Sequence, residues 1–594
     1  MSVDYLQHPL DVKNIILKRD QIKKDLLNSG INFLEKKIAI LGGSTTSELI
    51  NFLDIFLLNI GIKASFYESD YGKYLEEALF GNKDLEQFNP DVIYIHTTSK
   101  NIDNFPGFSS TRELIQSLVD EEVKKYTSIW SSLDKFNAII IQNNFELPAY
   151  RTLGNLDAVD FRGRVNFTNQ LNALLHQEIA NHKSVFLNDI HYLSSMIGLS
   201  SWYDNRLWST YKYAASFHGL VFLAQNINKI ISAAFGFNKK NLVLDLDNTL
   251  WGGVIGDDGI KKIKIGEDGS IGEAFKNFQL ELKRLKDSGI LLSVASKNEI
   301  ENAYLGLSHP DGILKKDDFA SIKANWEPKD QNIQLMGKDI NLGLDSFVFI
   351  DDNPAERALV EENLPTVSVP KIGNDPNKYF EFIDKEGYFE RVTLAADDID
   401  RSRYYSENQA RTEIEAKFKS QDEFLKSLEM KAIINYFDDL SLERITQLIN
   451  KTNQFNLTTK RYSIKEVIKL KEDKSIFSFY GRLADRFGDN GLISVLIAKH
   501  IDKSLHIDSW LMSCRVLKRG MEYAMFNFLL EIARKNNFKS ITGTYIPTEK
   551  NKMVEKLYLD LGFELISESK NENTYMIKIL ESTSDLNHFI TVTD

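Results

Sequence analysis

Two aspartates, Asp245 and Asp247, stand two residues apart in the run Asp245-Leu246-Asp247-Asn248-Thr249, directly after the apolar residues 242–244. Alternate side chains of a strand share one face, so both carboxylates are expected on the same side. Two carboxylates this close are not both comfortably ionised unless a cation shares them. Mg²⁺ takes such oxygen ligands and usually keeps a substrate phosphate in its shell. The spacing therefore predicts phosphate chemistry, with one carboxylate attacking phosphorus and the other acting as general acid and base.

Further polar residues follow in chain order, each at a predicted strand end or helix start. Ser296 ends the run ILLSVAS, Lys329 follows Pro328, and Asp351 and Asp352 follow the run FVFI. A hydroxyl can hold a phosphate oxygen, a lysine neutralises phosphate as a point charge, and two more aspartates supply hard oxygen ligands. Because α/β sheets bind ligands at the carboxyl ends of their strands, we expect these side chains to lie close to Asp245.

The elements that must position these residues alternate along the chain. Within residues 237–395, short apolar runs alternate with amphipathic stretches such as 272–289, whose apolar residues recur at three- and four-residue steps. This β-α-β order predicts a parallel sheet. The same alternation, beginning with KKIAILGG, predicts an α/β domain over residues 1–236. Residues 430–594 place strands next to strands, which favours α+β, and the charged residues 396–429 are interpreted as a helical linker. The prediction is an α/β multidomain protein.

Composition narrows the class of protein. The 594 residues are 43% hydrophobic and 26% charged, which is typical of soluble globular proteins. A net charge of −12 without a basic patch disfavours nucleic acid and anionic membrane as partners. The single cysteine, Cys514, excludes an internal disulfide and fits a reducing compartment. We find no signal peptide and no apolar run long enough to span a bilayer, so we expect a cytoplasmic protein.

The runs DLDNTL, SKN, Lys329 and DD together resemble the four-motif signature of the haloacid dehalogenase-like (HAD) phosphotransferases. The resemblance implies that Asp245 is the nucleophile and Asp247 the acid/base. It also implies that Mg²⁺ is held near the main-chain carbonyl of Asp247 and the side chain of Asp351. The resulting metal-ligand candidates are Asp245, Asp247, Asp351 and Asp352, and the phosphate-binding candidates are Thr249, Ser296, Asn298 and Lys329. The alternative is that Asp247-Asn248 is only a helix cap and Asp351-Asp352 only a turn.

Longer runs resemble the FkbH-like family: LDLDNTLWGGVIGDDG, ANWEPK, FVFIDDNPAER, NKTNQFNLTTKRY, DRFGDNGLISV and SCRVLKRGMEYA. The resemblance implies transfer of a glyceryl unit from 1,3-bisphosphoglycerate, with loss of phosphate, to the phosphopantetheine thiol of an acyl carrier protein in polyketide-type metabolism. Many such proteins carry a cysteine where this chain has Ala295. This departure leaves open a small-molecule phosphatase. A scaffold that docks carrier protein and has a vestigial site is the third alternative.

The insert 251–259 follows the nucleophile strand and is rich in Gly and Asp, which suit tight turns. We expect either a small β-flap that excludes water from the site or a plain hairpin.

The C-terminal order of elements resembles the GNAT acyltransferase fold, in which a helix start receives the pyrophosphate of coenzyme A. Residues 515–520 match the usual pattern R/Q-x-x-G-x-G/A at Arg515 and Gly520, whereas Lys518 replaces the first glycine. Coenzyme A binding is therefore left open. Tyr558, which follows Asn551, is either the acid for a leaving thiolate or a core residue.

The N-terminal domain resembles the SGNH hydrolases, which have a flavodoxin-like sheet. Ser44, in LGGSTTS, stands where their nucleophile stands, and Asn143 or Asn144 is the candidate for an oxyanion hole. His191 and His218 are the candidate bases. The alternative is a docking or structural module.

Overall fold

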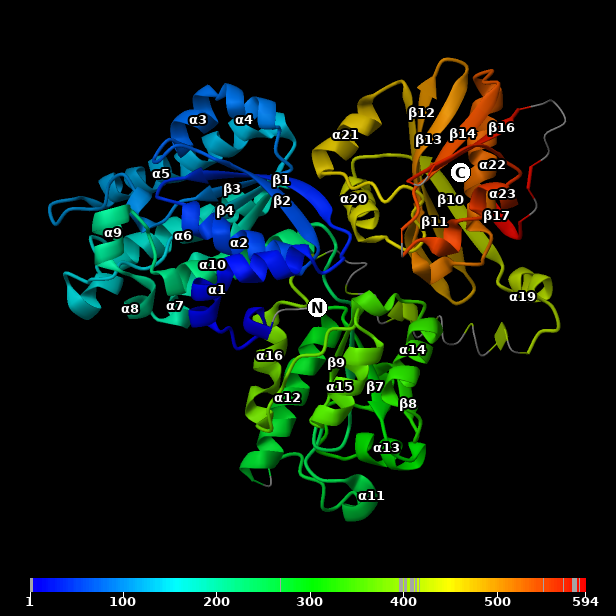
Figure 1. Cartoon of the computed structure of the whole chain (residues 1–594), viewed down its shortest axis with the longest axis horizontal. Coiled ribbons are helices and arrows are strands. Elements are labelled where there is room, and N and C mark those ends of the chain that lie inside the picture. Colours follow the sequence, from blue (N-terminus) through cyan, green and yellow to red (C-terminus); the bar gives the residue numbers. More distant parts are fainter. Residues whose placement is uncertain are drawn as a thin grey trace. The chain divides into compact units, whose positions relative to one another are not determined.

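The computed structural model describes residues 4–593 except 268, 395–398, 400–402, 406, 408–410, 412–413, 416, 549, 570, 580–584 and 587. The chain divides into two compact units, one formed by residues 1–234 with 463–465 and the other by 235–462 with 466–594. Figure 1 shows the elements of both. Within the described residues, no helix combines the length and the apolar character needed to cross a membrane.

The first unit is built on a parallel sheet of five strands in the order β2-β1-β3-β4-β5. Its strands are β1 (Leu34–Gly42), β2 (Ile62–Glu68), β3 (Val92–His96), β4 (Ile139–Asn143) and β5 (Val185–Asn188). Every residue of β3 is buried, as expected for a parallel strand covered on both faces. Helices α5 and α6 pack on the face that presents Ala39 and Ile93, whereas α1, α2 and α10 pack against one another (Figure 1).

The helices of this unit are α1 (Val12–Leu27), α2 (Ser47–Asn59), α3 (Tyr74–Phe80), α4 (Lys83–Phe88), α5 (Arg112–Leu133), α6 (Arg164–Asn181), α7 (Ile190–Ile197), α8 (Leu199–Trp202), α9 (Asn205–Tyr211) and α10 (Phe217–Ala234).

The second unit contains a parallel sheet of four strands in the order β8-β7-β6-β9. The strands are β6 (Asn241–Leu244), β7 (Leu291–Ser296), β8 (Phe319–Ala324) and β9 (Phe347–Ile350). Leu242 and Leu244 of β6 pack with Phe275 and Leu282 of α12, whereas Val243 packs on the opposite face with Ile333 of α14. Side chains of β6 thus alternate between the two faces of the sheet, and Asp245 is the residue that directly follows this strand.

The helices around this sheet are α11 (Ile255–Asp258), α12 (Ser270–Asp287), α13 (Ile300–Leu307), α14 (Lys329–Asp339), α15 (Pro354–Asn363) and α16 (Tyr379–Glu386). The amphipathic pattern in 272–289 falls in α12, and it buries Phe275, Phe278 and Leu282 as predicted. Ser288 caps α12, and Gly289 follows with φ +93°, a backbone conformation that residues other than glycine rarely adopt.

The same unit contains a mixed sheet of eight strands in the order β15-β16-β14-β13-β12-β11-β10-β17. Its strands are β10 (Met430–Tyr436), β11 (Ile476–Asp485), β12 (Gly488–Ile501), β13 (Ser504–Met512), β14 (Ser540–Tyr545), β15 (Glu564–Glu568), β16 (Asn573–Lys578) and β17 (Ile590–Thr593). Most neighbours are antiparallel, but β13 pairs with β14, and β10 with β17, in parallel.

The helices of this part are α19 (Gln421–Ser427), α20 (Leu442–Lys451), α21 (Ile464–Glu472), α22 (Met521–Lys535) and α23 (Leu557–Asp560). The predicted α/β multidomain class with parallel sheets is confirmed. Part of the linker predicted for 396–429 lies outside the described residues, and α19 falls within its described part.

Candidate active site

The charged residues of the central sheet meet at its carboxyl edge because β6 and β9 lie side by side in register. Leu244 is paired with Ile350, so Asp245 and Asp351 are the next residues on two neighbouring strands. Lys329, the first residue of α14, reaches both of them. Its Nζ lies 2.8 Å from Oδ1 of Asp245 and 2.5 Å from Oδ2 of Asp351. All three side chains are buried, so their charges interact with little screening by solvent.

Three carboxylates of this edge form one acidic group. Asp245, Asp351 and Asp352 each offer an oxygen within 4.8 Å of the others. Burial, and then the charge of Asp245, raises the pKa of Asp351 to about 7, and the same two causes raise the pKa of Asp352. One lysine therefore faces more negative charge than it neutralises. A divalent cation with oxygen ligands fits this group of residues.

The side chain of Asp247 has different partners. Its Oδ1 accepts hydrogen bonds from Nε1 of Trp251 at 2.8 Å and from the backbone N–H of Ile255 at 3.1 Å. Its Oδ2 accepts one from Nδ2 of Asn298 at 2.9 Å. Burial raises the pKa of Asp247. The side chain of Asp247 is thus not part of the acidic group above, and the metal contact that the resemblance implies for this residue is through its main-chain carbonyl.

The four phosphate-binding candidates divide in two. Lys329 lies in the acidic group, and Ser296 is buried at the end of β7, the strand next to β6. Thr249 instead accepts a hydrogen bond from the backbone N–H of Asp352 at 3.3 Å, which ties the turn after β6 to the turn after β9. Asn298 is engaged with Asp247. The structure therefore gives Thr249 and Asn298 contacts within the protein that the sequence did not indicate.

Arg357 is a site residue that the sequence reasoning missed. Its Nη1 donates to the main-chain oxygens of Asp351 and Asp352 at 2.5 and 2.9 Å, so it holds the turn that carries both aspartates. Asn353 caps α15 and Pro354 is its first residue, a pairing that marks a helix start in sequence. The Asn-Pro pair therefore indicates where the helix begins, but it does not indicate that the side chain of Arg357, one turn later, bonds back to the turn after β9.

The insert after β6 is not a two-stranded flap. Gly252 forms one bridge with Lys264, and residues 255–258 form a single helical turn, α11. The carboxylate of Asp258 accepts the N–H of Val254 at 3.0 Å, so a local side-chain bond replaces the pairing that a hairpin needs. Trp251 is fully buried beneath this turn.

Residues 515–520, which partly match the pyrophosphate-binding pattern, precede α22 and contain two residues in the left-handed conformation. Gly520, the residue before α22, has φ +82°, and Lys518 adopts φ +64° where the usual pattern has glycine. The chain thus keeps the left-handed conformation at 518 despite the side chain. Arg515 donates from Nε to the hydroxyl of Ser513 at 3.1 Å.

Tyr558 and Asn551 are structural residues. Tyr558 is fully buried, and its hydroxyl has no hydrogen-bond partner within the described part of the chain. Its ring packs on Gly543, where a Cβ would lie 2.4 Å from the hydroxyl oxygen. This burial favours the core-packing alternative over the role as an acid. Asn551 donates to the main-chain oxygens of Asn456 and Ile546 at 2.8 and 2.9 Å.

Asn551 supports a segment that closes the gap between β13 and β14. The two strands are paired only from Ser504 with Ser540 to Ile507 with Gly543. Beyond that point, residues 455–457 bond to both sides: Leu457 N to Trp510 O at 3.1 Å, Met512 N to Phe455 O at 3.0 Å, and Ile546 N to Leu457 O at 2.9 Å. The opening between the strands is therefore filled by the chain itself.

The residues proposed as a hydrolase site in the first unit are not assembled as one. Ser44 is buried and its Oγ has no hydrogen-bond partner among the residues described. His191 Nδ1 contacts Asn172 at 3.0 Å, and the ring of His218 packs at a tilt against that of Phe222. Asn143 accepts hydrogen bonds from Tyr94 and Asn188 and donates to the main-chain oxygen of Thr97, so its amide is committed to the interior.

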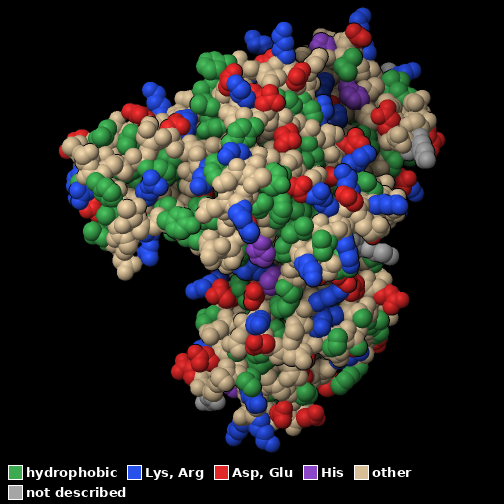
Figure 2. Space-filling view, turned by 60° about the vertical axis from the view of Figure 1, so that its left-hand side comes forward, with side chains coloured by type: hydrophobic (Ala, Val, Ile, Leu, Met, Phe, Trp, Pro, Cys, Tyr) green, Lys and Arg blue, Asp and Glu red, His purple; other side chains and the backbone are tan. Residues whose placement is uncertain are grey.

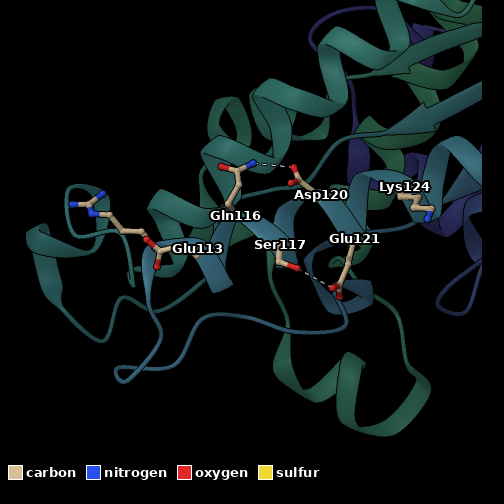
Figure 3. Close-up of a pocket in the computed structure, with 7 residues that line it drawn as sticks. Glu113, Gln116, Ser117, Asp120, Glu121 and Lys124 are labelled. Atoms are coloured by element: carbon tan, nitrogen blue, oxygen red, sulfur yellow. Dashed lines mark hydrogen bonds between the residues drawn. The ribbon is translucent and has the colours of Figure 1, made fainter.

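A shallow depression lies along the exposed face of α5 (Figure 3). Figure 3 shows Gln116 bonded to Asp120 and Ser117 bonded to Glu121, at 2.8 and 3.0 Å. These are neighbouring side chains one helical turn apart, which is the ordinary arrangement of a solvated helix face. Acidic and basic side chains are likewise interspersed over the face of the molecule that Figure 2 shows.

Comparisons with known proteins found one family model and several solved structures that match parts of the chain. The family model described as FkbH, N-terminal domain, matches residues 37–232. The crystal structure of the N-terminal part of the protein BF1531 from Bacteroides fragilis, containing a phosphatase domain and complexed with Mg, is 28% identical with a TM-score of 0.58. It aligns over 63% of this chain and 99% of its own length. No curated protein matches.

Two acetyltransferase structures align with about a quarter of the chain. The ribosomal-protein-S18-alanine N-acetyltransferase from Escherichia coli is 12% identical and covers 26% of this chain and 99% of its own, with a TM-score of 0.21. The spermidine N-acetyltransferase from Vibrio cholerae, in complex with CoA and spermine, is 16% identical and covers 25% and 96%, with a TM-score of 0.21.

The parallel central sheet and the acidic group at its carboxyl edge place the central region in the HAD-like class. The match of residues 37–232 to the FkbH N-terminal domain model, together with the likeness to BF1531, supports the more specific resemblance to the FkbH-like family.

Proposed function

We propose that the central region is a magnesium-dependent phosphatase or phosphotransferase of the HAD type, with Asp245 as nucleophile. The observation that carries the proposal is the placement of one buried lysine, Lys329, against Asp245 and Asp351, with Asp352 beside them. Buried acidic groups with an excess of negative charge are rare without a cation or a catalytic role. The Mg held by the related BF1531 structure supports the choice of metal.

The residues of the chain divide the reaction between them. Asp245, Asp351 and Asp352 would hold Mg²⁺, which would neutralise charge on the transferring phosphoryl group. Lys329 fixes the carboxylate of Asp245 through a contact of 2.8 Å and adds positive charge at the phosphate. Asp245 attacks phosphorus while Asp247 gives a proton to the leaving oxygen. Asp247 then takes a proton from the water that attacks the aspartyl-phosphate in the second step, which releases phosphate and frees Asp245.

The more specific function that we propose is transfer of a glyceryl unit from 1,3-bisphosphoglycerate to the phosphopantetheine thiol of an acyl carrier protein. The FkbH-like family resemblance supports it. Ala295, which replaces the usual cysteine, is fully buried in the core cluster that contains Val243 and Phe349. In this chain the acyl group would therefore pass directly to the carrier thiol, without an acyl-cysteine at that position.

A small-molecule phosphatase is the second candidate, and the same residue, Ala295, favours it. Both activities need the acidic group, but only glyceryl transfer needs a carrier protein.

Intact-protein mass spectrometry separates these candidates. The full chain is mixed with Mg²⁺, a panel of phosphopantetheinylated carrier proteins and freshly generated 1,3-bisphosphoglycerate. A carrier that gains the mass of one glyceryl group with the wild-type chain, and not with Asp245→Asn, supports transfer. Phosphate release without any carrier adduct supports the phosphatase. No phosphate release with any substrate would contradict both and favour a docking scaffold.

A further inference from the structure

The carboxylate of Asp247 is held by donors from two separate stretches of the chain. Trp251 Nε1 and the N–H of Ile255 belong to the insert after β6, and both bond to Oδ1. Asn298 Nδ2 belongs to the turn after β7 and bonds to Oδ2. Oδ1 thus has both lone pairs engaged, whereas Oδ2 keeps one lone pair free of these three donors. This asymmetry distinguishes the two oxygens of the same carboxylate.

The amide of Asn298 is fixed in the orientation that faces Asp247. Its Oδ1 accepts the backbone N–H of Glu299 at 2.9 Å and Nδ2 of Asn302 at 3.2 Å. A backbone N–H only donates, so the oxygen of the amide must lie on that side and the nitrogen must face Asp247. The donor to Oδ2 is therefore set by the start of α13 and not by a free side chain.

The indole of Trp251 is fixed by packing. The side chain is fully buried, and its only donor is the N–H that bonds to Asp247. Gly306 of α13 makes room for it: a Cβ at that position would lie 2.5 Å from the ring, and 3.0 Å from Ile255. The insert and α13 thus interlock around the indole, and a ring that is unable to turn keeps its N–H directed at Oδ1.

We propose that Trp251 and Asn298 are positioning residues for the acid/base Asp247, and that they direct Oδ2 toward the leaving group. The inference rests on the proposed phosphotransfer function. As Asp245 forms its bond to phosphorus and the bond from phosphorus to the leaving oxygen breaks, the proton on Oδ2 of Asp247 passes to that oxygen. The reverse transfer, from the attacking water to Oδ2, accompanies cleavage of the aspartyl-phosphate. Residues 251–259 then serve to orient the acid and not to cover the site.

This role has a signature that depends on the leaving group. A poor leaving group needs the proton, whereas 4-nitrophenolate leaves without one. The test uses the full chain with Mg²⁺ and two substrates, 4-nitrophenyl phosphate and phenyl phosphate. Trp251→Phe removes the N–H and keeps an aromatic ring. Trp326→Phe is the matched control, because it removes an indole N–H bonded at 2.7 Å to another carboxylate of the same domain, that of Glu299.

We expect Trp251→Phe to lower kcat for phenyl phosphate by roughly tenfold to a hundredfold, since general acid catalysis contributes about 10²–10⁴-fold. With 4-nitrophenyl phosphate the loss should stay within about threefold. KM should be unchanged for both substrates, and Trp326→Phe should match the wild type. Asn298→Ala, which acts on the other oxygen, should show the same dependence on leaving group. If Trp251→Phe does not fold, the result with Asn298→Ala tests the proposed positioning of Asp247 on its own.

Two results would overturn the inference in distinguishable ways. Equal losses on both substrates in Trp251→Phe and in Asn298→Ala would mean that these residues only support the fold, and the phosphatase assignment would stand. A wild-type chain that hydrolyses neither substrate, and no other phosphate ester or acyl phosphate, would remove the proposed function itself and with it the need for an acid.

Discussion

Two buried clusters of the second unit contain aspartate and lysine, yet their charge balance is opposite. At the edge of the central sheet, one lysine faces Asp245, Asp351 and Asp352. In the C-terminal sheet, the carboxylate of Asp508 accepts three hydrogen bonds. The donors are Nζ of Lys460 at 2.7 Å, Nζ of Lys499 at 2.9 Å and the hydroxyl of Tyr462 at 2.5 Å. The first cluster has an excess of negative charge, whereas in the second the one carboxylate is faced by two lysines.

The pKa values follow this balance. Burial and the charge of Asp245 raise the pKa of Asp351 to about 7. Burial also acts to raise the pKa of Asp508, but the hydrogen bonds from Lys460, Tyr462 and Lys499 outweigh it and lower the value to about 2. The comparison teaches that a buried ion pair is not by itself a functional sign. An excess of buried negative charge, which only an added cation or a proton can relieve, indicates a functional site.

The largest expected effect is that of Asp245→Asn. Removal of the nucleophile should lower phosphate release by more than about 10³-fold. Because the same change removes one of the repelling carboxylates, it should also raise the melting temperature without Mg²⁺, by about 2–4 °C for each kcal/mol gained. Phosphate release and thermal melting check this. Activity that survives in Asp245→Asn would contradict the assignment of the nucleophile.

Replacing the only lysine of the acidic group should have the next largest effect. Lys329→Met removes the charge that faces Asp245 and Asp351, and loss of such a group costs about 10²–10³-fold in kcat. The three carboxylates would then repel one another unless a cation binds, so Mg²⁺ should raise the melting temperature more in Lys329→Met than in the wild type. An equal shift in both proteins would show that the cation does not relieve this repulsion.

Asp508→Asn is the matched change in the C-terminal cluster, and its effect should be on stability alone. Two lysines lose their partner, but their side chains are 43% and 40% exposed, so solvent compensates for part of the loss. We expect a loss of about 1–2 kcal/mol in the free energy of unfolding at neutral pH. kcat should equal that of the wild type. Denaturant melts and phosphate release measure the two quantities, and a fall in kcat would break the comparison.

The smallest effect is the pH dependence of that loss. The folded pKa of Asp508, about 2, lies below the value near 4 of an unfolded aspartate. The stability that Asp508 contributes is therefore fully present above about pH 4 and is lost as the pH falls toward 2. The difference between wild type and Asp508→Asn should shrink over this window. A difference that stays constant down to pH 2 would mean that the contribution of Asp508 is not electrostatic.

The central site could be predicted from sequence because its residues stand at strand ends. Asp245 and Asp351 follow apolar runs, and the parallel order brings such ends to one edge without any knowledge of packing. Trp251 and Arg357 could not be assigned in this way. Their partners are fixed by how the insert packs on α13 and by how α15 is oriented, and neither is encoded in local spacing.

The roles of Tyr558 and Asn551 in the C-terminal sheet likewise depend on packing that the sequence does not reveal. A tyrosine near the end of a chain suits both catalysis and a core, and only the close packing on Gly543 decides for the core in the case of Tyr558. The role of Asn551 depends on residues 455–457, which precede it by almost a hundred positions and reach between β13 and β14. Such non-local backbone pairing carries no periodicity that a sequence displays.

The most direct test of the central claim is to identify the residue that carries phosphate during turnover. The wild-type chain is mixed with Mg²⁺ and 1,3-bisphosphoglycerate or 4-nitrophenyl phosphate, quenched in acid while phosphate is being released, and mapped by peptide mass spectrometry. The peptide that contains Asp245 should gain the mass of one phosphoryl group, and Asp508→Asn should show the same gain. Phosphate release with the phosphoryl group on another residue, such as Asp351, would contradict the account.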